Sequence, residues 1–313
     1  RIGCDSAAKA RHTSLTTTAG PTRSAVAQGC VLPAARDLAE KKTTKATKLY
    51  DAVRQTDVPK QRIMEATRGA ILARGGKGVP LLLETLRAPD KTTLNIGLRT
   101  ARELPGRAVT DALAAELGRT PSERSGPLFL ALADREDAAV LPVVLSTCKS
   151  GAKSLRLLAI EVLVRDGKPA CVPVLLDTLA DNDAELAKAA KAALARLWGK
   201  DVDEQLTARL PQASGSNRRW LVELAGQRHV AAAVPGLIKA AKDSDPVIRA
   251  AGVKALGETA EAMDLGAMTE LLASAKSAED IADLQSALET ACMRITDKAA
   301  CAARLLPALA ASP

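Results

Sequence analysis

One apolar phrase recurs along this chain at a fixed spacing. It reads VPLLLETL at residues 79–86, VPVLLDTL at 172–179 and VPGLIKA at 234–240. The prolines of these phrases and of one further copy are Pro80, Pro142, Pro173 and Pro235. Their separations of 62, 31 and 62 residues are all multiples of 31. A constant internal period of this length indicates a repeat architecture, in which one supersecondary unit is copied along the chain.

Three other columns of the repeat are apolar at each 31-residue step. Two residues after the proline landmark, the column holds Leu82, Leu113, Val144, Leu175, Leu206, Leu237 and Met268. Six residues after it, the column holds Leu86, Leu117, Cys148, Leu179, Leu210, Ala241 and Leu272. At twenty-one residues after it, the column holds Ala101, Leu132, Leu163, Leu194, Ala225 and Leu256. These columns predict one apolar seam shared by neighbouring repeats.

Each repeat divides into two amphipathic segments joined by a polar turn. In the copy at residues 170–198, ACVPVLLDTLA is followed by the turn DND and then by AELAKAAKAALARLW. Apolar residues recur every three or four positions in both segments, which is typical of helices. Aromatic residues make up only 1% of the chain, whereas strands favour aromatic and β-branched side chains. We therefore predict an all-α fold: an α-solenoid of antiparallel helical hairpins, each about 31 residues long.

The repeats predict a single array over residues 1–313. Within it we expect irregular helical repeats at 1–74, regular repeats at 75–296 and the start of a truncated further repeat at 297–313. Solenoids need polar terminal caps to stay soluble, and neither end of the sequence reads as one. The first residue is Arg1. We therefore expect the chain to be a segment of a larger protein.

The segment DSDPVIRAAGVKALGE at residues 243–258 resembles the second half of a HEAT repeat. The resemblance is to the short bacterial type that also occurs in phycobilisome-lyase-like proteins, and it covers residues 75–313 best. Arg249 stands at the arginine position of the motif, and Arg156 and Arg218 fall in the same column. Leucine, serine or alanine fills that column elsewhere, which predicts an incomplete polar ladder between repeats. The resemblance implies a bacterial multidomain host, often secreted or envelope-associated.

A HEAT-like array is expected to receive partners on the surface lined by its second helices. The side chains predicted for this concave surface are Asn95, Arg99, Arg102, Glu161, Lys188, Arg219, Trp220, Glu223 and Lys254. For Trp220, packing between repeats is the alternative to a binding role, and for Trp198 packing is the prediction. We therefore expect a non-catalytic scaffold or recognition module that binds a protein partner, or other domains of the same polypeptide, without a cofactor.

Two other functions stay open at the level of sequence. Residues 1–107 carry 20 Lys and Arg against 9 Asp and Glu, and such a basic region can attract nucleic acid or an acidic polymer. Mixed charges along the predicted surface and the scarcity of aromatic residues argue against a nucleic-acid groove. A lyase activity is suggested only by the name of the related repeat family, and fold analogy is weak support for chemistry.

The six cysteines and two histidines show no metal-binding or nucleophilic pattern. Cys292 and Cys301 flank a turn at nearly equal distance, so the two sides of a hairpin could bring them within disulfide range. Burial as two small core residues is the alternative. Cys4 and Cys30 could form a similar bridge. Cys171 is expected to be partly exposed at the beginning of a helix, and no transmembrane segment or signal peptide is visible.

Overall fold

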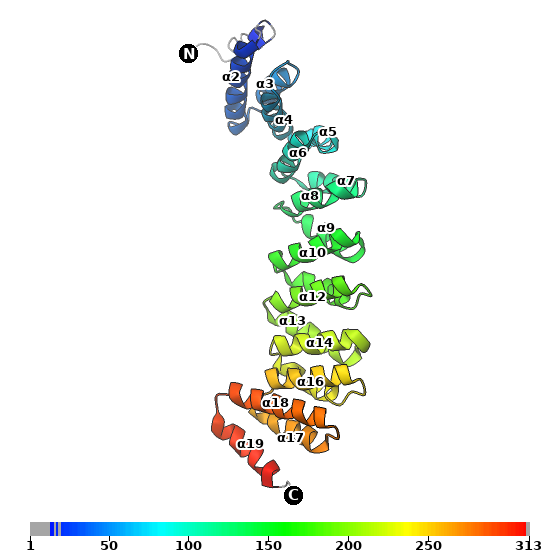
Figure 1. Cartoon of the computed structure of the whole chain (residues 1–313). Coiled ribbons are helices and arrows are strands. Elements are labelled where there is room, and N and C mark those ends of the chain that lie inside the picture. Colours follow the sequence, from blue (N-terminus) through cyan, green and yellow to red (C-terminus); the bar gives the residue numbers. More distant parts are fainter. Residues whose placement is uncertain (1–12, 16, 18–19, 311–313) are drawn as a thin grey trace. The chain divides into compact units, whose positions relative to one another are not determined.

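Every regular element of the protein is a helix in the residues that the structure describes, which are 13–15, 17 and 20–310 of the computed structural model (Figure 1). Contacts between residues divide the chain into two units, Arg1–Val144 and Leu145–Pro313. The helices of the first unit are α2 (Gly20–Ala39), α3 (Thr43–Arg54), α4 (Lys60–Arg74), α5 (Val79–Arg87), α6 (Lys91–Glu103), α7 (Arg107–Leu117) and α8 (Ser122–Ala133). Helix α9 (Val140–Ser150) contains the division between the units.

The second unit continues the same alternation of helices. Its helices are α10 (Lys153–Asp166), α11 (Val172–Leu179), α12 (Ala184–Arg196), α13 (Lys200–Arg209), α14 (Gly215–Gln227), α15 (Val234–Ala240), α16 (Pro246–Thr259), α17 (Leu265–Ser274), α18 (Ala278–Arg294) and α19 (Lys298–Ala310). Short 3-10 turns precede or follow several of them, at Gly75–Gly78, Pro169–Cys171, Leu210–Gln212, Ala231–Ala233 and Ala262–Asp264. The predicted α-solenoid of helical hairpins is therefore confirmed as the fold class.

The predicted apolar seam is buried in both units. All seven residues of the column that begins at Leu82 are at most 1% exposed. All six residues of the column that begins at Ala101 are fully buried. In the remaining column Leu117 and Leu272 are only half-buried, while its other members lie in the core. The 31-residue period thus marks the side chains that pack helix against helix.

The ends of the helices follow from the residues at the turns. Pro80, Pro173 and Pro235 lie in the first turn of α5, α11 and α15, where the missing backbone N–H costs no helical hydrogen bond. The second helix of several hairpins begins after an aspartate or serine whose side chain accepts a hydrogen bond from a first-turn amide. These capping residues are Asp90, Asp183, Asp245 and Ser277.

Two glycines let successive second helices of the second unit approach closely. A Cβ on Gly226 of α14 would lie 2.9 Å from the Cα of Ala255 on α16. A Cβ on Gly257 of α16 would lie 3.0 Å from the Cα of Ala287 on α18. At Gly226 the contact is shorter than real Cβ atoms show, so glycine is required there, whereas at Gly257 the neighbouring helix would have to shift by a few tenths of an ångström. The two glycines are 31 residues apart, so the close approach recurs in consecutive repeats.

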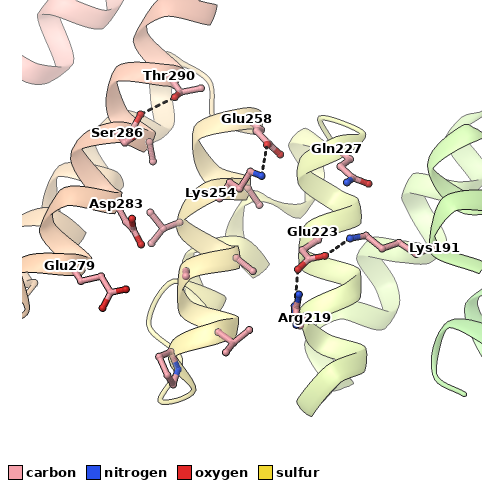
Figure 2. Close-up of a pocket in the computed structure, with 17 residues that line it drawn as sticks. Lys191, Arg219, Glu223, Gln227, Lys254, Glu258, Glu279, Asp283, Ser286 and Thr290 are labelled. Atoms are coloured by element: carbon pink, nitrogen blue, oxygen red, sulfur yellow. Dashed lines mark hydrogen bonds and ion pairs between the residues drawn. The ribbon is translucent and has the colours of Figure 1, made fainter. Parts of the chain in front are cut away.

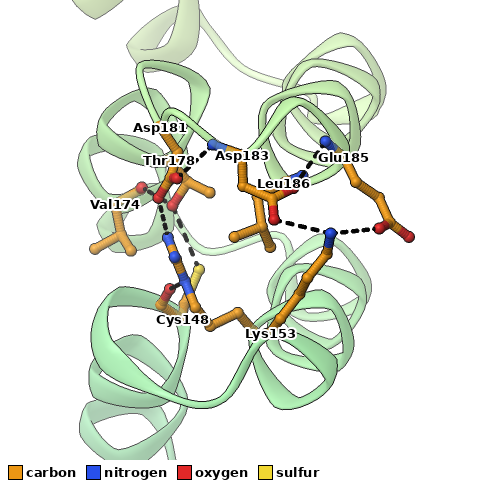
Figure 3. A network of polar contacts seen from close by, with 9 residues as sticks. Cys148, Lys153, Val174, Thr178, Asp181, Asp183, Glu185 and Leu186 are labelled. Carbon is orange, nitrogen blue, oxygen red and sulfur yellow. Dashed lines mark hydrogen bonds and ion pairs between the residues drawn. The ribbon is translucent and has the colours of Figure 1, made fainter.

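Arginines of the HEAT-like column join one hairpin of the second unit to the next. Arg156 donates to the carbonyl oxygen of Cys148 at 2.8 Å and to the carboxylate of Asp181 at 2.6 Å. Asp181 in turn accepts from the backbone N–H of Asp183, the residue that caps α12 (Figure 3). Arg218 makes the equivalent ion pair with Asp243 at 3.1 Å. The polar ladder predicted from the arginine column is therefore present where the arginine is.

Two predictions about buried side chains are wrong. Trp198, expected to pack between repeats, is 95% exposed because α12 ends at Arg196 and the chain turns at Gly199 with a positive φ of 120°. Cys171, expected to be partly exposed, is 1% exposed because the 3-10 turn before α11 directs it into the core. The single-array organisation with boundaries at 74 and 296 stays a prediction.

Candidate functional site

A groove crosses the second helices of four consecutive hairpins in the second unit. It encloses about 960 Å³ and is lined by side chains of α12, α14, α16 and α18 (Figure 2). Its charged and hydroxyl-bearing members are Lys191, Arg219, Glu223, Lys254, Glu258, Glu279, Asp283, Ser286 and Thr290. Because each second helix is held by a buried seam on its other side, these side chains are presented on a packed support.

The α14 side of the groove is built around one carboxylate that holds two cations. Glu223 accepts a hydrogen bond from Arg219 at 2.7 Å and forms an ion pair with Lys191 (Figure 2). Burial raises the pKa of Glu223, but the hydrogen bonds from Lys191 and Arg219 outweigh it and hold that pKa below its ordinary value. The Lys191 ammonium and the Arg219 guanidinium also lie 4.8 and 5.2 Å from the centre of the Trp220 ring. This cluster carries one net positive charge and is fixed before any partner arrives.

The floor of the groove is apolar and open to solvent. It is formed by the first turns of α16, where Pro246 and Ala250 are exposed and Val247 is 50% exposed. Farther along α16, Lys254 and Glu258 face each other at 3.9 Å, which is a weak surface pair. The floor therefore offers apolar surface that nothing within the described chain covers.

The α18 side of the groove is acidic and then hydroxylic. Glu279, Asp283, Ser286 and Thr290 follow one another at spacings of four, three and four residues, so they share one face of the helix. All four are exposed. The Thr290 hydroxyl donates to the Ser286 carbonyl oxygen at 2.8 Å (Figure 2). Among the residues that the structure describes, neither Glu279 nor Asp283 forms an ion pair.

The groove gathers only some of the side chains predicted for the concave surface. Arg219, Glu223 and Lys254 line it, and Trp220 lies behind it under the two cations. Glu161 and Lys188 are exposed on α10 and α12 of the same unit but are not among its lining residues. In the first unit, α6 carries Asn95, Arg99 and Arg102, all exposed. Their role in binding stays a prediction.

The cations on α6 are already engaged with carboxylates of their own unit. Arg99 pairs with Glu103 at 3.1 Å, and Arg102 pairs with Asp134 at 2.9 Å. Arg68, on the preceding second helix α4, also binds Glu103. These pairs reduce the free positive charge that this face of the first unit can offer.

Sequence reasoning missed the acidic side of the groove. A 31-residue step from Lys254 reaches Gln285, whereas the structure places Asp283 in the groove. Ala287, which lies against Gly257 of α16, also lines the groove, so α18 turns its α16-facing side to the groove rather than the face that the 31-residue step marks. The signal that could have found the pair is the spacing of Glu279 and Asp283 on one face of a predicted helix.

Three further features of the residues with described positions concern metal ligands, membrane spans and thiols. No group of three or more His, Cys, Asp or Glu side chains there could hold a metal ion. None of the helices between residues 13 and 310 that the structure describes combines the length and the apolar character needed to cross a bilayer. Cys292 and Cys301 are free thiols, and burial, followed by the neighbouring Cys301, raises the pKa of Cys292. Their bridge stays a prediction, and the one with Cys4 lies outside the described residues.

Comparison with known families agrees with this helical arrangement. The family model of HEAT repeats matches residues 203–289, which run from α13 into α18 and include most of the groove. These residues are HEAT repeats. The resemblance predicted from the motif at 243–258 is thereby confirmed, and the HEAT-repeat segment contains Arg219, Glu223, Lys254 and Asp283. A search of curated proteins found no significant match.

Solved structures that match this chain at low identity include the following three. A chain of the Kap95p–RanGDP structure is 14% identical, with 97% of this chain and 46% of that chain covered and a TM-score of 0.49. Human deoxyhypusine hydroxylase is 18% identical, with 69% and 96% covered and a TM-score of 0.33. A designed armadillo repeat protein in complex with a peptide is 18% identical, with 68% and 99% covered and a TM-score of 0.30. No ligand or activity is transferred from them to the HEAT repeats of this chain.

Proposed function

We propose that this chain is a non-catalytic recognition module that binds a segment of a protein partner in the groove across α12, α14, α16 and α18. One observation carries the proposal: the exposed apolar floor at Val247 and Ala250 lies between side walls of opposite charge. An apolar patch rimmed by charged groups is typical of a protein interaction site. The partner is another protein or another domain of the same polypeptide.

The groove supports binding better than catalysis. Its charged groups are either paired, as in Lys191–Glu223 and Arg219–Glu223, or exposed to solvent on α18. No histidine, cysteine or base-activated hydroxyl lines it. The hydroxyl of Thr290 donates to a backbone carbonyl rather than to a base. The non-catalytic role is therefore the function that the groove supports best.

Nucleic-acid binding is the less favoured alternative. The basic residues of the first unit that could contact phosphates are largely committed to ion pairs, such as Arg74 with Asp51, Arg87 with Glu116 and Arg102 with Asp134. A nucleic-acid interface needs cations free to replace the counterions of the phosphates.

Two matched variants, in each of which an exposed alanine is replaced by arginine, test the proposal. Ala250→Arg places a long charged side chain on the floor of the groove, where Ala250 is exposed. Ala273→Arg places the same side chain on α17, where Ala273 is exposed and outside the groove. We expect a partner captured from the native host to lose binding to the first variant and to keep binding to the second. Equal binding to both variants, or no capture by the unmodified protein, would contradict the proposal.

A further inference from the structure

Within the described residues, neither carboxylate of the acidic pair Glu279 and Asp283 on α18 forms an ion pair, unlike the neighbouring Asp280. Asp280, one residue after Glu279, binds the Arg249 guanidinium at 2.9 Å, and its backbone N–H bonds the Ser277 cap. Glu279 lies in the first turn, where the helix dipole favours an acid. Asp283 lies beyond that turn and gains little from the dipole. The contacts of Asp283 within the described residues therefore indicate no structural role for its carboxylate.

Glu279 and Asp283 also repel one another. Side chains four residues apart on a helix are neighbours, about 6 Å apart at their Cβ atoms, and like charges at this spacing weaken the helix. Of the described cations that line the groove, Lys191 and Arg219 bind Glu223, and Lys254 forms a weak exposed pair with Glu258. A cation supplied by another molecule would relieve this repulsion.

Two carboxylates alone do not make a binding site, but these two stand at the edge of a large groove. Glu279 and Asp283 line the same cavity of about 960 Å³ as Pro246, Val247 and Ala250. The half-exposed Val247 side chain provides apolar surface for the same occupant. With only two carboxylates and no third ligand, the pair is not a metal site. A volume of about 960 Å³ can hold several side chains of a polypeptide.

We propose that the occupant of the groove is a cationic polypeptide segment, an inference that rests on the proposed function. Two Lys or Arg side chains of the segment bind Glu279 and Asp283, and an apolar side chain between them lies on Val247 and Ala250. In an extended segment, residues two apart point the same way and lie about 7 Å from each other, close to the spacing of about 6 Å between the Cβ atoms of residues four apart on a helix. The segment therefore carries basic residues at alternate positions, with its apolar residue facing α16.

The distribution of charge favours this occupant over an anionic one. The α14 cluster of Lys191, Arg219 and Glu223 has one net positive charge, whereas Glu279 and Asp283 together carry two negative charges that form no ion pair within the described residues. A phosphate chain laid in the groove would meet both carboxylates directly. The whole chain has a net charge of +8, so attraction of a basic segment requires this local acidic surface rather than the overall field.

Three labelled peptides of equal length test the proposal by fluorescence anisotropy. The first alternates Lys and Leu, the second replaces Lys by Glu, and the third replaces Lys by Gln. We expect the basic peptide to bind the unmodified protein at least ten-fold more tightly than either other peptide. Its affinity should fall as salt is raised, because the attraction is screened. Ala250→Arg should abolish binding.

Charge reversal on α18 gives the decisive comparison. The double variant Glu279→Lys with Asp283→Lys should bind the acidic peptide more tightly than the basic one. The ratio of the two affinities should be about the inverse of the ratio for the unmodified protein. The control variant, Glu270→Lys with Glu289→Lys, makes the same change of net charge at exposed positions outside the groove. We expect this control to keep the preference for the basic peptide. Thermal unfolding establishes that each variant folds, and Glu279→Gln with Asp283→Asn replaces the reversal variant if it does not.

The outcomes separate this inference from the proposed function. If the acidic or the neutral peptide binds best, or if both double variants behave alike, the cationic segment is overturned. The same holds if a single-stranded oligonucleotide displaces the basic peptide from the groove. In these cases the proposed function would still be supported if Ala250→Arg abolishes binding of the native partner. If no peptide binds and Ala250→Arg changes nothing, both proposals fail.

Discussion

Arg135 and Arg228 make the same set of hydrogen bonds at two places in the chain, 93 residues apart. The Arg135 guanidinium donates to the carbonyl oxygens of Ala101, Leu104 and Gly106. That of Arg228 donates to the carbonyl oxygens of Leu194, Leu197 and Gly199. The last carbonyls of a helix have no partner within it, so each arginine satisfies the end of the preceding second helix. Because 93 residues are three repeats of 31, the two arginines occupy equivalent positions and make the same type of helix-end contact.

Removing this helix-end contact should destabilise the protein. Arg228 is nearly buried, and its substitution by alanine leaves three carbonyls and Asp203 without their donor. We expect Arg228→Ala to lower the free energy of unfolding of the second unit by about 2–4 kcal/mol, because buried groups lose charged hydrogen bonds. Arg228→Lys should recover little, since a single ammonium cannot match the planar guanidinium. Urea unfolding followed by circular dichroism measures both.

The control for that experiment is Arg209→Ala. Arg209 pairs with Asp177 at 2.7 Å, but both side chains are exposed, and such pairs contribute about 0–1 kcal/mol. If Arg209→Ala lowers the free energy of unfolding as much as Arg228→Ala does, the hydrogen bonds to the carbonyls contribute no more stability than an exposed ion pair.

Acid should weaken the first unit through Glu116. This buried carboxylate accepts two hydrogen bonds from Arg87, at 2.8 and 2.6 Å, which hold the pKa of Glu116 below its ordinary value of 4.5. Because the pKa is lower in the folded state, the stabilisation is complete above pH 4.5 and is lost as the pH falls through the folded pKa. We expect Glu116→Gln to cost about 1–2 kcal/mol at pH 7 and much less once Glu116 is protonated.

Unfolding midpoints at several pH values between 7 and 3 measure this difference. A gap between the two proteins that stays constant over the whole range would exclude Glu116 as a source of the pH dependence.

Trp198 should behave as a surface side chain. It is 95% exposed, so Trp198→Ala should change the free energy of unfolding by less than about 0.5 kcal/mol. In a Trp220→Phe variant, the remaining fluorescence comes from Trp198, and acrylamide should quench it almost as well as free indole. A protected Trp198 would restore the packing role that the sequence predicts.

Cys292 and Cys301 are predicted to form a bridge under oxidising conditions. Cys301 is buried at 5% exposure and interacts with Cys292, whose side chain is half-buried. After mild oxidation of the folded protein, proteolysis and mass spectrometry should find the two cysteines linked. The fully buried Cys148 is the internal control and should stay reduced. Free thiols at both Cys292 and Cys301 after oxidation would remove the prediction.

The buried seam could be predicted because burial repeats with the period of the sequence. Leu113, Leu175 and Leu206 are all fully buried, as the 31-residue columns require. Arg135 and Arg228 could not be found in this way, because the column is not constant in the regular repeats, where Leu104, Asp166, Leu197 and Thr259 fill its other positions. Their partners are backbone carbonyls. Every residue type has one, so the sequence does not indicate which residues accept these hydrogen bonds.

The sequence alone determined that this chain is a stack of helical hairpins, because an amphipathic pattern of fixed period fixes which side chains must leave water. It also supplied the HEAT-like motif and three of the residues in the groove. Tertiary structure decided where the groove lies and which charges face it. Helix α18 turns its α16-facing side to the groove, and Gly226 allows the close approach of Ala255 on the neighbouring helix. Distances between helices depend on packing, which the order of residues within one helix does not specify.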